Sequence, residues 1–179
     1  TAGVRGRVSY RGNGDYRNDY GVFSTYQILL DENDQFTLGA EFRRRSYPEG
    51  PLRSRSRNIA ELTANWNRSL LDGKASFSLD AFGGWENATQ NRLDGNSSFY
   101  GLSPTYNFTL NDQWGGYVFF WWQHDSYNSE RYSSEPSDDA VAVGTRADDL
   151  YELGGGLTWE FGDGWSLNPE ILYIEDNSN

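Results

Sequence analysis

The single histidine of the chain, His124, is followed two residues later by Ser126. In a β-strand, residues two apart point to the same face, so these side chains would lie next to each other. A histidine beside a serine can activate the hydroxyl for acyl transfer if a third group orients the ring and donors stabilise the oxyanion. Neither requirement has a signature near residues 124–126, so we expect a histidine at a membrane interface and no catalysis.

A larger set of candidate residues carries charge. By period-two alternation, the charged residues assigned to one common face are Arg5, Arg7, Glu41, Arg43, Arg45, Glu61, Asp80, Glu152, Glu160 and Glu170. Charges of both signs on one face require water or each other as partners. Two interpretations stay open: a polar pore whose field sorts solutes, and a lattice of ion pairs that fills a narrow interior.

Segment 114–123 is aromatic on both faces. If Trp122 faces outward, then Tyr117, Phe119 and Trp121 face inward. Rings on a wet inner surface could stack on sugar rings, or they could pack against a plug or an inward-folded loop. We therefore add these three residues to the predicted pore lining.

The elements that must position these residues are strands, because helical periodicity is rare and period-two alternation recurs. The alternation is clearest where Tyr151, Leu153 and Leu157 interleave with Glu152 and Thr158. Nine segments are predicted as strands: 2–11, 20–30, 36–46, 58–70, 75–86, 98–110, 114–125, 150–161 and 165–175. Their lengths are roughly the 9–11 residues that a tilted strand needs to cross a bilayer.

The connections between these segments alternate in length. Four are short and rich in Asp, Asn and Gly, as tight hairpins require: 31–35, 72–74, 111–113 and 162–164. The predicted long ones are 11–19, 47–57, 87–97 and 126–149. Short turns at one rim and long loops at the other are typical of bacterial outer-membrane barrels.

Aromatic residues recur where these segments begin or end. Rings at a membrane interface keep an apolar body in lipid and a polar edge in water. The predicted membrane-interface residues are Phe36, Trp85, Trp114, Trp122, Trp159 and Trp165.

Composition excludes several classes of function. The net charge of −11 argues against a nucleic-acid partner, and the absence of Cys removes disulfides, thiol catalysis and cysteine-based zinc sites. The acidic stretches 135–139 and 148–149 lack EF-hand spacing, so we expect neither a metal nor a cofactor. The chain is polar on average, with a mean hydropathy of −0.78, yet 16% aromatic, a combination that a membrane barrel explains. The first residues look like the interior of a longer precursor.

The C-terminal part carries a resemblance. Residues 145–161, followed by Gly164-Trp-Ser-Leu-Asn-Pro-Glu170 and Asp176-Asn-Ser-Asn179, resemble the closing region of barrels that follow periplasmic tetratricopeptide repeats. Such barrels occur in the surface lipoprotein assembly modifier family and related tetratricopeptide-linked outer-membrane proteins. The resemblance implies a Gram-negative outer membrane, a periplasmic repeat domain and a secreted substrate as possible partners.

The sequence thus predicts one domain, residues 1–179, forming an antiparallel transmembrane β-barrel or part of a larger, even-stranded one. We expect a porin-like, non-enzymatic protein that transports or exports a polar substrate and contacts outer-membrane lipid and lipopolysaccharide. The alternatives are a soluble β-sandwich that binds carbohydrate and, least favoured, a barrel-borne lipid hydrolase that uses His124 and Ser126.

Overall fold

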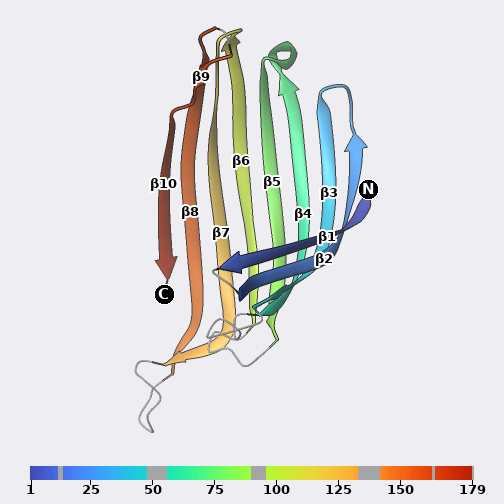
Figure 1. The fold of residues 1–179 in the computed structure, drawn as a ribbon, viewed down its shortest axis with the longest axis vertical. Coiled ribbons are helices and arrows are strands. Elements are labelled where there is room, and N and C mark those ends of the chain that lie inside the picture. Colours follow the sequence, from blue (N-terminus) through green and yellow to red (C-terminus); the bar gives the residue numbers. More distant parts are fainter. Residues whose placement is uncertain (12–13, 48–55, 90–95, 133–141, 163, 179) are drawn as a thin grey trace.

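The chain folds into antiparallel β-strands that follow one another along the sequence (Figure 1). This computed structural model describes residues 1–11, 14–47, 56–89, 96–132, 142–162 and 164–178, without the side chains of 10–16, 129–132 and 142–144. The strands are β1 (Ala2–Arg11), β2 (Gly14–Leu29), β3 (Asp34–Ser46), β4 (Arg57–Leu70), β5 (Ala75–Ala88), β6 (Ser97–Asn111), β7 (Trp114–Tyr132), β8 (Ala142–Glu160), β9 (Ser166–Leu167) and β10 (Glu170–Ser178).

The sheet is a meander in the order β1-β2-β3-β4-β5-β6-β7-β8-β10, and β9 pairs with β8 beside this path. The predicted all-β class and antiparallel pairing are confirmed. The count differs by one, because the predicted strand 165–175 is divided into β9 and β10. The break falls at Asn168-Pro169, where proline has no N–H to donate to a ladder.

All four predicted short turns are confirmed, and they lie at the same end of the sheet (Figure 1). The predicted long connection 11–19 is wrong, because β2 begins at Gly14 and Arg11 already pairs with Gly14. The connection 126–149 is also shorter than predicted, since β7 reaches Tyr132 and β8 starts at Ala142. Polar residues on both faces concealed these strand ends, because alternation disappears where neither face is apolar.

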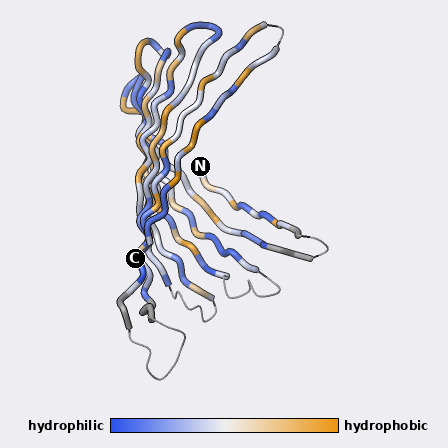
Figure 2. Tube along the Cα trace, turned by 90° about the vertical axis from the view of Figure 1, so that its left-hand side faces the viewer, coloured by the Kyte–Doolittle hydropathy of each residue, from blue (hydrophilic) through white to orange (hydrophobic). Residues whose placement is uncertain are grey.

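The described strands form one layer. They make a single sheet, with no second described sheet against it, whereas the sandwich alternative requires two. Ile59, Ala75 and Phe99 are the apolar side chains that the described residues bury. Figure 2 shows the sheet bending strongly, so that β1 and the start of β2 swing away from the C-terminal strands. The path from β1 to β10 is open, so a closed barrel remains a prediction.

Among the described residues, no helix is long and apolar enough to cross a membrane.

The turn between β2 and β3 is closed by a carboxylate. Oδ1 of Asp31 accepts hydrogen bonds from the backbone N–H groups of Asn33 at 2.7 Å and Asp34 at 2.8 Å. These bonds hold the pKa of the Asp31 carboxyl below its usual value. In the β6–β7 turn, Asn111 Oδ1 makes the same two bonds, to the N–H groups of Gln113 and Trp114. The two turns share a geometry and differ in charge.

This difference predicts a pH dependence confined to one turn. Because the folded-state pKa of Asp31 is lowered, its contribution to stability is present above the ordinary aspartate pKa and is lost as pH falls through the folded-state value. Asp31→Asn keeps the hydrogen-bond acceptor and removes the titrating group, so the free energy of unfolding should fall less as the pH is lowered. Asn111→Asp introduces a titrating group in the matching turn, so the free energy of unfolding should fall more as the pH is lowered. Urea unfolding across an acid pH series measures both changes. If both variants show the same pH dependence of the free energy of unfolding as the wild type, the prediction is contradicted.

Candidate functional site

The strand register sorts the predicted site residues onto one face. Arg43 pairs with Gly21 and Ile59, and Glu61 pairs with Glu41 and Gly84. Side chains of paired residues point the same way from the sheet, and their direction alternates along each strand. By this criterion one surface, the polar face, carries every predicted pore-lining residue: Arg5, Arg7, Glu41, Arg43, Arg45, Glu61, Asp80, Tyr117, Phe119, Trp121, Glu152, Glu160 and Glu170. That they line a pore remains a prediction.

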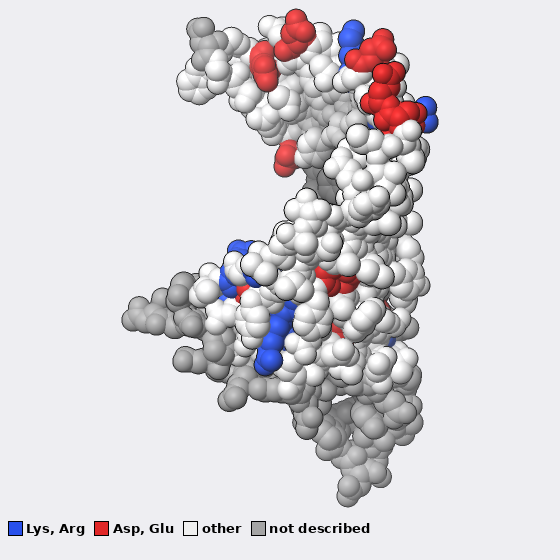
Figure 3. Space-filling view, turned by 90° about the vertical axis from the view of Figure 1, so that its right-hand side faces the viewer, with Lys and Arg blue, Asp and Glu red and all other residues white. Residues whose placement is uncertain are grey.

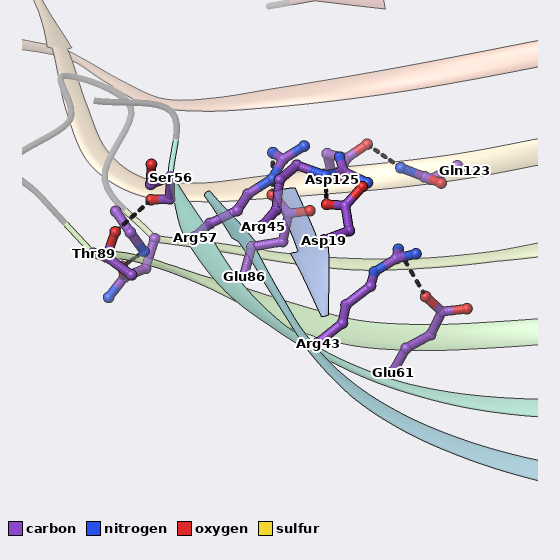
Figure 4. Close-up of polar contacts among 12 residues, drawn as sticks. Asp19, Arg43, Arg45, Ser56, Arg57, Glu61, Glu86, Thr89, Gln123 and Asp125 are labelled. Carbon is purple, nitrogen blue, oxygen red and sulfur yellow. Dashed lines mark hydrogen bonds and ion pairs between the residues drawn. The ribbon is translucent and has the colours of Figure 1, made fainter. Parts of the chain in front are cut away.

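Ion pairs cross the polar face near the long connections (Figure 4). Asp19 Oδ1 accepts from Nε of Arg45 at 3.0 Å, and its second oxygen lies 2.9 Å from Nε of Arg17. Arg43 Nη2 lies 3.5 Å from Glu61 Oε2. Each of these three arginines therefore has a carboxylate oxygen within 3.5 Å.

Two further pairs extend this lattice. Arg57 of β4 pairs with Glu86 of β5 at 2.5 Å, and Arg5 of β1 pairs with Glu41 of β3 at 3.3 Å. The Arg5 side chain is half exposed, whereas those of Arg57 and Glu86 are about one-fifth exposed. The lattice is therefore more enclosed at its centre than at the β1 edge.

The centre of the polar face is hollowed. A cavity of about 390 Å³ is lined by residues of five consecutive strands: Arg43, Glu61, Phe82, Glu86, Phe99, Trp121, Gln123 and Asp125. One wall is aromatic, because the rings of Phe82 and Trp121 stack with centroids 5.8 Å apart and an interplanar angle of 19°. Opposite charges and a flat apolar wall in one hollow can hold a polar molecule that also has an apolar face.

Two of the three predicted inward aromatics have another role. The Phe119 ring covers Gly154, and an added Cβ there would lie 2.5 Å from it. Tyr117 covers Gly156 in the same way, and its hydroxyl donates to Glu170 at 2.8 Å. These rings fill the space that glycine leaves on a neighbouring strand, so among the three it is Trp121 that faces the cavity.

Several members of this site were not predicted: Asp19, Arg57, Glu86 and Asp125. Asp19 and Arg57 fell within predicted loops, and Glu86 and Asp125 closed predicted strands without being assigned a role. A usable signal existed for three of them, because Arg57, Glu86 and Asp125 continue the alternation of the predicted pore-lining residues on their own strands.

The opposite surface, the apolar face, carries exposed Val22, Phe42, Leu62 and Leu153. The predicted interface residues on it are Phe36, Trp85, Trp114, Trp122 and Trp159, whereas Trp165 lies in the turn before β9 and is 70% exposed. Trp114 and Trp159 stack at 5.3 Å near the short turns. Trp66, which donates to Asp34, belongs to the same end and was missed.

His124 and Ser126 also lie on the apolar face, and here the structure adds a third residue. His124 Nε2 is 3.0 Å from Ser126 Oγ, and Nδ1 is 3.0 Å from Oδ1 of Asp149 on β8. The orienting group that the local sequence lacks comes from a neighbouring strand. Asp149 was missed because it fell in the predicted loop 126–149.

No cluster of three or more potential metal ligands occurs among the described residues. Of the acidic stretches, 135–139 lies outside the described residues. Asp148 pairs with Arg146, and Asp149 bonds with His124, so both carboxylates have a partner within the protein.

Comparison with known proteins adds no relative to this description. The chain matches no family model, no curated protein and no solved structure. The resemblance to the surface lipoprotein assembly modifier family therefore stays a prediction.

Proposed function

We propose that the chain forms a wall of a transmembrane β-barrel in a Gram-negative outer membrane, with the polar face toward an aqueous interior through which a polar substrate is transported or exported. One observation carries this proposal. The register gathers all thirteen predicted pore-lining residues on one face and the exposed apolar side chains of Val22, Phe42, Leu62 and Leu153 on the other. A sheet with one polar and one apolar face suits a barrel wall that has hydrocarbon on its outside and water on its inside.

The distribution of charge along the strands also supports strands that cross a membrane. In Figure 3, Lys, Arg, Asp and Glu form two groups on the visible face, one at its upper end and one around and below its middle, and a largely uncharged zone separates them. Outer-membrane barrels carry an apolar band about 25 Å tall between two polar rims. Lipid and lipopolysaccharide would then contact the apolar face, and a repeat domain or a secreted substrate would meet the barrel ends.

The open edges of the sheet bear on how the barrel closes. β1 and β10 each have one paired neighbour, so their outer edges carry unpaired backbone groups within the described sheet. Such edges do not occur in hydrocarbon, because each unsatisfied N–H or C=O costs several kcal/mol there. We therefore place these strands in a larger barrel in which both edges are paired.

Ion selectivity tests the proposal. The full-length protein in planar bilayers should conduct, and Arg43→Gln should raise the cation-to-anion permeability ratio by about twofold or more, because it leaves Glu61 without its counter-charge. Glu61→Gln should lower the ratio, and the exchanged pair Arg43→Glu with Glu61→Arg should return it toward the original value.

Arg44 supplies the matched control. It neighbours Arg43 and lies on the apolar face, so Arg44→Gln should leave the reversal potential unchanged. Absence of conductance, or an equal shift from Arg43→Gln and Arg44→Gln, would contradict a pore lined by the polar face.

A further inference from the structure

Ser126, His124 and Asp149 form a continuous hydrogen-bonded chain on the apolar face. An ionised carboxylate can only accept, so the 3.0 Å contact to Asp149 requires a proton on Nδ1 of His124. In the neutral ring Nε2 then lacks a proton and accepts from Oγ–H of Ser126, 3.0 Å away. This is the tautomer in which histidine serves as a general base for serine.

Neighbouring side chains hold this arrangement in place. Trp122 Nε1 donates to the same oxygen, Oδ1 of Asp149, at 3.1 Å, so two side chains hold this carboxylate. The ring of Tyr100 lies 5.2 Å from the His124 ring, centroid to centroid. The orientation of the imidazole is thus set by a carboxylate from β8, an indole from β7 and a phenol ring from β6.

The side chains next to Ser126 are small, and the strand pairing beside it is irregular. Its cross-strand neighbours are Ser98 on β6 and Ala147 on β8, so no large side chain flanks the hydroxyl in its own row. The β7–β8 register shifts directly after Ser126, before Glu130. Such bulges recur beside active sites because they redirect side chains and backbone groups out of the regular ladder.

The position along β7 indicates the substrate class. His124 comes ten residues after Trp114 in the strand. With about 3.4 Å per residue and a tilt of about 45°, ten residues rise about 24 Å, close to the height of an outer-membrane apolar band. Leu102, Phe120 and Leu153 lie on the same face, on the short-turn side of His124. An acyl chain along this surface would bring its ester to the level of Ser126.

We propose that Ser126, His124 and Asp149 constitute a serine hydrolase site for the carboxylic esters of membrane lipids. Ser126 Oγ attacks the ester carbonyl and its proton moves to His124 Nε2. The bond between the carbonyl carbon and the lipid alkoxide breaks, and the alkoxide leaves with that proton as an alcohol. Water, deprotonated by His124, then attacks the acyl-serine, and the fatty acid leaves while the proton returns to Oγ. Asp149 is the positioning residue for the ring.

The experiment uses the full-length protein in mixed micelles with a fluorophosphonate probe, which phosphonylates activated serines. We expect labelling at Ser126 by peptide mass, and release of fatty acid from diacyl phosphatidylcholine but not from its diether analogue. Ser126→Ala should abolish both signals, and His124→Gln should lower the labelling rate by about 1000-fold. Ser98→Ala, which removes the hydroxyl across the strand, should leave both intact.

Asp149→Asn keeps the shape of the site but no longer requires a proton on Nδ1, so it should slow labelling by orders of magnitude without preventing folding. No labelling of the wild type, or equal labelling after Ser126→Ala, would overturn the proposal and favour the sequence-based expectation of a non-enzymatic protein. Conductance should be the same in wild type and Ser126→Ala, which separates this test from that of the pore.

Discussion

Replacing Asp19 with asparagine is expected to lower the free energy of unfolding by about 2 kcal/mol. Asp19 is the shared counter-charge of Arg17 and Arg45, and its side chain is 13% exposed. Asparagine has nearly the same volume but leaves the two enclosed guanidinium groups of Arg17 and Arg45 without their shared negative charge. Urea unfolding in lipid vesicles, followed by tryptophan fluorescence, measures the change.

Arg68→Gln is the comparison variant for this prediction. Arg68 pairs with Asp34 at 3.4 Å, but its side chain is 50% exposed, so solvent screens the attraction. We expect a loss below about 1 kcal/mol. If Asp19→Asn is no more damaging than Arg68→Gln, the lattice on the polar face is not enclosed in the way that the structure indicates.

Alanine at Gly154 is expected to destabilise the sheet by about 2 kcal/mol, because the added methyl would overlap the aromatic ring that covers this position. A Cβ at Gly154 would lie 2.5 Å from Cε1 and 2.7 Å from Cζ of Phe119, with the Ile171 carbonyl oxygen at 3.2 Å. The ring must leave its place, and the stacking of Phe119 on Tyr117 at 6.2 Å is disturbed with it. The same unfolding assay reports the loss.

A second substitution shows whether the ring is the cause. Phe119→Ala should cost stability by itself, yet the double variant with Gly154→Ala should fall short of the summed losses by about 1 kcal/mol, because the overlap is gone. Gly6→Ala is the control, since nothing lies within 4 Å of its added Cβ. Additive losses, or an equal loss at Gly6, would show that glycine is not required under the ring.

The strand pattern was predictable because apolar residues that alternate with polar ones indicate which face of the sheet they occupy. Tyr151, Leu153 and Leu157 alternate with polar residues, and the register confirms that they share a face. The four short turns were predictable for a separate reason, since Asp31 and Asn111 both accept backbone hydrogen bonds in the way that tight turns require.

The strand ends were not predictable by the same rule. Residues 14–19 read as a polar loop, yet they pair with β1 and β3, and Asp19 is held there by Arg45 of β3. Where both faces are polar, pairing is set by charges on neighbouring strands, which one strand's own pattern does not contain. Asp149 was missed for the same reason, because its partner His124 lies on another strand.

β7 and β8 are each 19 residues long, the greatest length among the described strands. In the proposed barrel, at about 3.3 Å per residue and a tilt of about 45°, each would rise about 44 Å along the membrane normal, against a hydrocarbon thickness of about 30 Å. The far end of this hairpin would therefore project beyond the bilayer as a spur. In Figure 1 the ends of β7 and β8 extend lower than those of the neighbouring strands. An antibody, a phage fibre or a protease approaching that side would meet the spur before any other described strand.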